Sequence, residues 1–162
     1  MVGKIVTITR NNNSLTGSVS ASENIEEVLP NESSWRSEDT VRFAGILADH
    51  GVDVLDVSSG GLHNKQKIFH GPGYQAHFSE AVKKAHGNRI LVTAVGGVSD
   101  GNVAQAILDK EQADAIFVGR YFQKNPGAVW KFADDLGVAI KNSHQSEVGY
   151  RGRPGKEKVT RQ

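Results

Sequence analysis

Short apolar stretches alternate along the chain with segments whose apolar residues recur at helical spacing. Residues 52–57, 89–95 and 113–118 are rich in β-branched and apolar side chains, which predicts three buried strands. Strands that alternate with helices form a parallel sheet with right-handed crossovers, so the pattern predicts an α/β fold. The first predicted helix begins at the cap Ser37 and stops at Gly51. The second runs from Tyr74 to His86, the third begins at Ser99 or Asp100, and the fourth runs from Pro126 to Leu136.

The two ends of the chain differ from this middle part. Residues 1–34 hold a short β-type stretch at 4–9, three consecutive asparagines and a serine-rich run. We expect a poorly ordered N-terminal segment with a remnant strand there. Residues 35–150 are expected to form the α/β region, and 151–162 a basic, flexible tail.

Length and composition exclude several fold classes and function classes. A chain of 162 residues forms at most one ordinary domain, and it is too short for a complete eight-unit barrel of about 250 residues. The formal charge is +1 with both signs interspersed, which argues against a nucleic-acid surface. No apolar run reaches the roughly 18 residues that span a bilayer, so we expect a cytoplasmic protein. The absence of cysteine excludes thiolate nucleophiles and cysteine-based zinc sites.

Glycines end two successive strands, each directly before a predicted helix. Gly96 and Gly97 follow the second strand, and Gly119 with Arg120 follows the third. Glycine lets a phosphate approach backbone N–H groups, a helix N-terminus favours an anion, and arginine grips phosphate through its planar fork. The alternative is that these glycines only form tight turns and Arg120 is solvated. Because both loops and the arginine occur together, we favour a phosphate site.

Histidine and aspartate offer weaker candidates. His63, His70 and His77 recur every seven residues without a carboxylate cluster, so no metal site is predicted. His50 precedes a helix-ending glycine, where a C-terminal capping role is the simpler interpretation. Asp53 and Asp56 lie in or beside the first predicted strand, where one of them could face the barrel interior, but a hydrogen-bonded structural carboxylate is expected rather than a catalytic one.

Several motifs together resemble one family. The stretches DHGVDVLDVSSGG, GPGYQAHFSEAVKKA, TAVGGVSDG and DAIFVGRYFQKNPGAVWKFADDLGV resemble, in register, the C-terminal half of the old yellow enzyme family, particularly fungal and bacterial NADPH dehydrogenases. The resemblance implies a partial (β/α)8 TIM barrel made of its last three to four βα units with parallel strands. It also implies a flavoprotein that holds FMN, takes hydride from NADPH and reduces electron-poor alkenes.

The resemblance also implies roles for individual residues. Gly96 and Gly97 would lie on the phosphate side of FMN after the seventh strand, and Gly119 with Arg120 after the eighth. Ser59, with Ser58, would end the sixth strand near the flavin, and residues 18–22 resemble the fifth strand. The family's first four strands and its substrate-binding histidine pair have no counterpart, so no catalytic residue is assigned. We expect a truncated form with impaired activity.

Two functions therefore stay open. The first is an FMN-dependent NADPH oxidoreductase of the ene-reductase type, acting on a small molecule without nucleic-acid or membrane partners. The second is a non-catalytic half-barrel that binds a phosphate-bearing ligand or requires a partner chain. A homo-oligomer or a complementing chain would cover the strand edges that a partial barrel leaves open.

Overall fold

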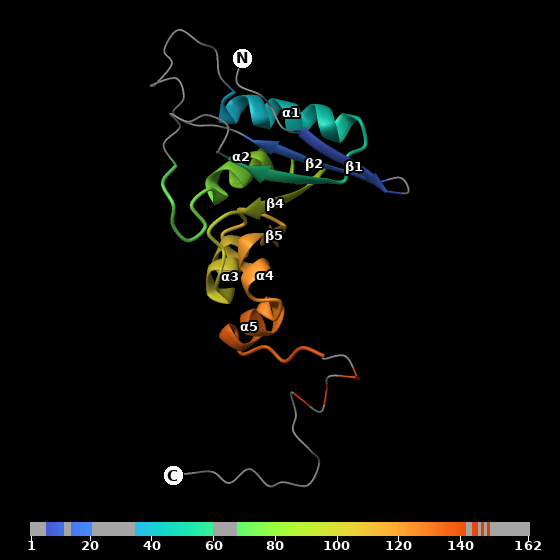
Figure 1. Ribbon diagram of the computed structural model, residues 1–162. Helices are drawn as coiled ribbons and strands as arrows, with labels where there is room; N and C mark the ends of the chain where they lie inside the picture. The colour runs from blue at the N-terminus through green and yellow to red at the C-terminus, as the bar shows by residue number, and fades with distance from the viewer. Residues whose placement is uncertain are drawn as a thin grey trace.

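The computed structural model describes residues 6–11, 14–20, 35–59 and 68–141, together with 144, 145, 147 and 149. Within these residues the chain forms one five-stranded sheet in the order β1-β2-β3-β4-β5, flanked by helices (Figure 1). β2 to β5 run parallel to one another, and β1 pairs antiparallel with β2. The predicted α/β class is confirmed.

The N-terminal segment contributes two of the five strands. β1 (Val6–Asn11) and β2 (Ser14–Ser20) form a hairpin, and β2 then pairs in parallel with β3. The sequence predicted only one remnant strand, at 4–9. The second strand overlaps the beginning of residues 18–22, where the resemblance places a barrel strand. The tail at 151–162 lies outside the described residues.

The first helix, α1 (Ser37–Asp49), begins one residue earlier than its predicted cap implies. Ser37 is helical and Arg36 is the N-cap, because the Asp39 carboxylate accepts a hydrogen bond from the Arg36 backbone N–H at 3.1 Å. The helix ends before Gly51, whose φ of +77° favours glycine. His50 accordingly caps the end as predicted, with its Nδ1 2.7 Å from the Ile46 carbonyl oxygen.

The parallel strands are shorter than the apolar stretches that predict them. β3 covers Val54–Ser58, β4 covers Leu91–Val95, and β5 covers only Ala115–Phe117. The crossover helices are α2 (Ala76–His86) and α3 (Gly101–Asp109). After β5 the chain forms a short helix that the pattern did not predict, α4 (Arg120–Lys124), and then α5 (Ala128–Asp135).

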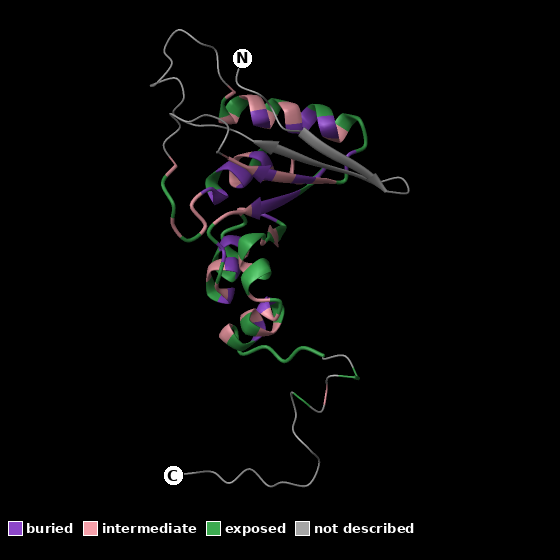
Figure 2. Ribbon diagram, in the orientation of Figure 1, coloured by how far each residue is buried: buried purple, intermediate pink, exposed green. Residues whose placement is uncertain are grey.

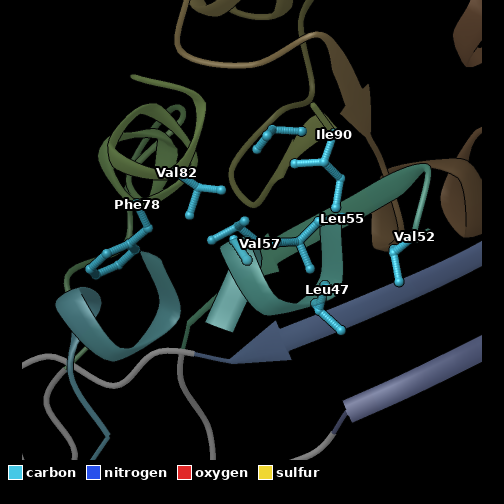
Figure 3. Close-up of a cluster of buried hydrophobic side chains, with 9 residues drawn as sticks. Leu47, Val52, Leu55, Val57, Phe78, Val82 and Ile90 are labelled. Carbon is cyan, nitrogen blue, oxygen red and sulfur yellow. The ribbon is translucent and has the colours of Figure 1, made fainter. Parts of the chain in front are cut away.

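One face of the sheet is covered by helices and holds the core (Figure 2). Leu55 and Val57 of β3 are fully buried against α1 and α2, where Figure 3 shows them close to Val82. Ala94 of β4 pairs with Ile116 of β5 in register and packs in a second cluster with Ile107 of α3. The register places Leu55 beside Val92 and Val57 beside Ala94, so both clusters lie on the same face.

Among the described residues the helices cover a single face, which distinguishes this sheet from a doubly wound one, in which helices cover both faces. α1, α2 and α3 all pack on the side of Leu55, Val57 and Ala94, as helices do outside the wall of a (β/α)8 barrel. The opposite face carries Asp56, whose Oδ1 accepts a hydrogen bond from Thr93 Oγ1 at 2.7 Å. Asp56 is therefore the hydrogen-bonded carboxylate that the sequence predicted.

The uncovered face also exposes apolar side chains. Leu91 at the beginning of β4 is 53% exposed, and Phe117 at the end of β5 is 47% exposed. β5 is an edge strand among the described residues, while β1 covers the other edge of the parallel strands. Across the described part of the chain, each helix is too short or too polar to cross a lipid bilayer.

Candidate functional site

A pocket of about 420 Å³ lies where β4 and β5 end. It receives Gly96 and Gly97 from the turn after β4, and Gly119 and Arg120 from the turn after β5. Four of the five site residues predicted from the sequence therefore line one pocket. The other described lining residues are Tyr74, Gln75, Val95, Val98, Ser99, Phe117, Val118, Tyr121 and Lys124.

The charges around this pocket have one sign. Arg120 and Lys124 are the charged side chains among its described lining residues, and that lining contains no carboxylate. Both lie on α4, four residues apart and so on the same side of the helix. Within the described part of the chain, neither side chain forms an ion pair or hydrogen bond. The pocket therefore favours an anionic ligand.

Among the three glycines that line the pocket, Gly119 is the one whose missing side chain the packing of the protein does not explain. A Cβ built on Gly119 meets no protein atom within 4 Å, and its φ of −96° is accessible to other residues. Gly119 itself lines the pocket. A side chain at this position would obstruct a ligand that approaches the backbone closely.

Gly96 and Gly97 have a structural explanation instead. Their φ angles are +107° and +68°, and a Cβ on Gly96 would lie 2.5 Å from the Gln75 Nε2 atom. A Cβ on Gly97 would overlap the carbonyl oxygen of Gly71. Glycine is thus needed at both positions by the protein's own packing, and the pair of glycines is not in itself evidence for a phosphate.

The N-terminus of α3 is occupied by the protein's own carboxylates. The Asp100 Oδ1 atom accepts hydrogen bonds from the backbone N–H groups of Asn102 at 2.8 Å and Val103 at 3.3 Å. Asp135 accepts from the Gly101 N–H at 3.1 Å. Hydrogen bonds from Lys131 and then from Gly101 hold the pKa of Asp135 below its ordinary value, so this carboxylate is charged. These carboxylates already cap α3, so the predicted anion position at this helix start stays a prediction.

α4 offers a helix start on the pocket in its place. It begins at Arg120, immediately after Gly119. The N–H groups of Phe122 and Gln123 donate to the Gly119 carbonyl oxygen, so only the first two N–H groups, those of Arg120 and Tyr121, have no partner within the helix. Lys124 was missed by sequence reasoning because the helix predicted after the third strand begins only at Pro126. Its spacing of four residues from Arg120 was the available signal.

Ser59, the fifth predicted site residue, does not line the pocket but is linked to it. Its backbone N–H and its Oγ both donate to the Oε1 atom of Gln75, at 2.9 and 2.7 Å. The Gln75 Nε2 atom donates to the carbonyl oxygen of Val95 at 2.6 Å. Gln75 is only 4% exposed and is the second residue that sequence reasoning missed.

The remaining candidates are the three histidines, of which the structure describes two. His70 packs its ring edge against Tyr74, His77 lies against the Phe78 ring, and His63 falls outside the described residues. Within the described ranges no three histidine or carboxylate side chains gather as a metal would require. The prediction of no metal site stays a prediction.

Comparison with known proteins supplies the family. No family model matches the chain. Over 122 residues it is 46% identical to the NADH:flavin oxidoreductase FG08077 of Gibberella zeae, which covers 74% of this chain and 29% of that protein. It is 37% identical to the NADPH dehydrogenase of a Geobacillus species over 115 residues, or 70% of this chain and 33% of that protein. The NADPH dehydrogenase of Listeria monocytogenes is 38% identical over 109 residues.

These similarities define the class first: the matched part of the chain is homologous to flavin-dependent oxidoreductases. More closely, its curated homologues are named NADH:flavin oxidoreductase and NADPH dehydrogenase, and the resemblance noted from its motifs is confirmed. The chain spans about a third of the length of the relatives it matches.

Proposed function

We propose that this chain forms the phosphate-binding part of an FMN site in an NADPH oxidoreductase that reduces electron-poor alkenes. The observation that carries the proposal is the shared pocket of Gly119, Arg120 and Lys124, which holds two unpaired cations and has no carboxylate among its described lining residues. In (β/α)8 barrels, phosphate groups recurrently bind at the loops after the last two strands and at the start of a short extra helix. β4, β5 and α4 occupy the corresponding order along this chain.

The residues present fit a phosphate monoester. The Arg120 guanidinium can donate two parallel hydrogen bonds to phosphate oxygens, and Lys124 adds a second positive charge from the same helix. The space beside Gly119 admits the phosphate next to the backbone N–H groups at the start of α4. A volume of about 420 Å³ lies within the usual range of roughly 300–1,000 Å³ for ligand pockets.

When bound, FMN would supply the hydride chemistry, accepting hydride from NADPH and delivering it to the alkene. The residues of this chain would bind and orient the cofactor. Arg120 and Lys124 would fix its phosphate end, while Ser59 at the end of β3 would lie nearer its ring system. Val95 and Phe117, which pair in register at the ends of β4 and β5, provide apolar surface between these two positions.

A titration of the purified chain with FMN and with riboflavin tests this function, because the two ligands differ only in the phosphate. We expect the chain to change the fluorescence of FMN with a Kd at least about tenfold lower than its Kd for riboflavin. A tenfold difference in Kd corresponds to one charge-assisted hydrogen bond or more. Equal affinities, or no FMN binding up to its solubility limit, would contradict the proposal. Bleaching of bound FMN by NADPH would then test the oxidoreductase activity directly.

A second function is favoured by the exposed apolar face. Leu91 and Phe117 lie uncovered on the sheet, and β5 is an edge among the described residues. A non-catalytic half-barrel that requires a partner chain or a second copy would cover them. Sedimentation or light scattering discriminates the two, since a monomer that binds FMN supports the first function and an FMN-free oligomer supports the second.

A further inference from the structure

The segment from Gly71 to Gln75 forms one wall of the pocket by lying over the turn after β4. The Gly71 carbonyl oxygen occupies the space where a Cβ on Gly97 would be, and the Tyr74 ring lies 3.0 Å from the position of a Cβ on Gly96. Tyr74 and Gln75 both line the pocket. The shape of this wall therefore depends on what holds the segment against β4.

Gln75 is the side chain that holds it. Its amide bridges two strand ends, because its oxygen accepts from Ser59 after β3 and its nitrogen donates to Val95 at the end of β4. The residue is 4% exposed, so these hydrogen bonds are shielded from water. A side-chain amide accepts and donates in this way at once, whereas an ionised carboxylate cannot donate and an alkyl chain can do neither.

We propose that Gln75 is a positioning residue that fixes the pocket wall by tying Ser59 to Val95, and that Gly96 is a glycine because it makes room for the Gln75 amide. This assignment rests on the proposed function for its effect on FMN. It also reassigns Gly96, which serves the packing of Gln75 rather than the approach of a phosphate. Gln75 acts on a ligand through the backbone it holds.

Gln75→Glu is the most informative variant. The introduced carboxylate can still accept from Ser59, but it faces the Val95 carbonyl oxygen without a hydrogen to donate. When protonated it regains that hydrogen, and burial raises the pKa of a carboxyl group toward the accessible range. We therefore expect the Kd for FMN, relative to wild type at the same pH, to be raised about tenfold or more at pH 8 and to return to within about threefold at pH 5.

A matched control comes from the same helix. Ser79 is fully buried and its Oγ donates to the Ala76 carbonyl oxygen, away from the pocket lining. Ser79→Ala removes a buried hydrogen bond of similar kind, so it reports loss of stability alone. We expect it to change the Kd for FMN less than about threefold at both pH values.

Amide hydrogen exchange supplies a readout that needs no ligand. The Ser59 N–H donates to Gln75, so Gln75→Leu should speed its exchange about tenfold or more while Ser79→Ala leaves it unchanged. Unchanged Ser59 exchange in Gln75→Leu, or a pH-independent Kd ratio in Gln75→Glu, would overturn the role of Gln75. If wild type binds no FMN, the proposed function fails, and the exchange result alone decides the role of Gln75.

Discussion

Lys83 of α2 reaches Asp114, which immediately precedes β5, with the Nζ atom 2.7 Å from the Asp114 Oδ1 atom. The second carboxylate oxygen accepts from the Val92 backbone N–H at 2.8 Å. Asp114 therefore joins three elements, α2, β4 and the beginning of β5. Partial burial opposes its ionisation, but the hydrogen bonds from Lys83 and Val92 outweigh it and hold the pKa of Asp114 below its ordinary value.

This lowered pKa predicts an acid-dependent part of the stability. A carboxylate with a lower pKa in the folded state stabilises the fold above its unfolded pKa, and this contribution is lost as the pH falls through the folded value. Asp114→Asn should lower the free energy of unfolding by about 1 kcal/mol at pH 7, and the difference from wild type should shrink below about pH 4. Urea unfolding at several pH values measures it.

Asp134→Asn is the control for this experiment, because Asp134 is exposed and its side chain forms no hydrogen bond or ion pair with the described residues. It should leave the pH dependence of unfolding as in wild type. An Asp114→Asn protein with the stability of wild type at pH 7 would show that the bridge to Lys83 and Val92 contributes nothing.

Arg120→Ala tests the anion site. Loss of a bidentate contact to phosphate should weaken FMN binding by about 1.5 to 3 kcal/mol and leave riboflavin binding nearly unchanged. The stability of the protein should not change, since the Arg120 side chain is exposed and unpaired within the described residues. Arg42→Ala, at a side chain that is 79% exposed on α1, is the matched control. Equal loss of FMN and riboflavin affinity would mean that Arg120 does not contact the phosphate.

Two glycine substitutions should separate ligand binding from folding. Gly119→Ala places a Cβ in open space, so the free energy of unfolding should change by less than about 0.5 kcal/mol while FMN binds more weakly. Gly97→Ala forces a Cβ against the Gly71 carbonyl oxygen at a φ of +68°, and should destabilise the fold by about 2 kcal/mol or more. Thermal unfolding and FMN titration of both variants measure the contrast. Destabilisation by Gly119→Ala would contradict it.

The sequence predicted the parts of the fold that local chemistry determines. Apolar periodicity located α1, α2, α3 and the three strands between 52 and 118, because each buries one continuous stripe or stretch against the same core. The short helix α4 escaped notice because five residues are too few to show a period. Boundaries were missed where side chains distant in sequence decide them, as at Asp114, whose carboxylate accepts from the Val92 N–H, so that β5 begins only at Ala115.

The site was predictable only in part, for a related reason. Glycines and an arginine at two strand ends are visible in the sequence, and parallel topology brings strand ends to one edge. Gln75 carried no such signal, because its partners lie 16 and 20 residues away and nothing near it in sequence indicates them. The Asp135 carboxylate at the start of α3 was missed for the same reason, because it reaches that helix start from 34 residues away.

That helix start yields the last prediction. Asp100 caps α3 by accepting from two backbone N–H groups, so Asp100→Ala should lower the free energy of unfolding by about 1 kcal/mol. Asp100→Ser keeps a capping oxygen and should restore most of it. Because the anion pocket lies at α4, FMN affinity should be the same in both variants as in wild type. Tighter FMN binding in Asp100→Ala would instead show that the carboxylate at α3 opposes the phosphate, and would place the anion near both helix starts.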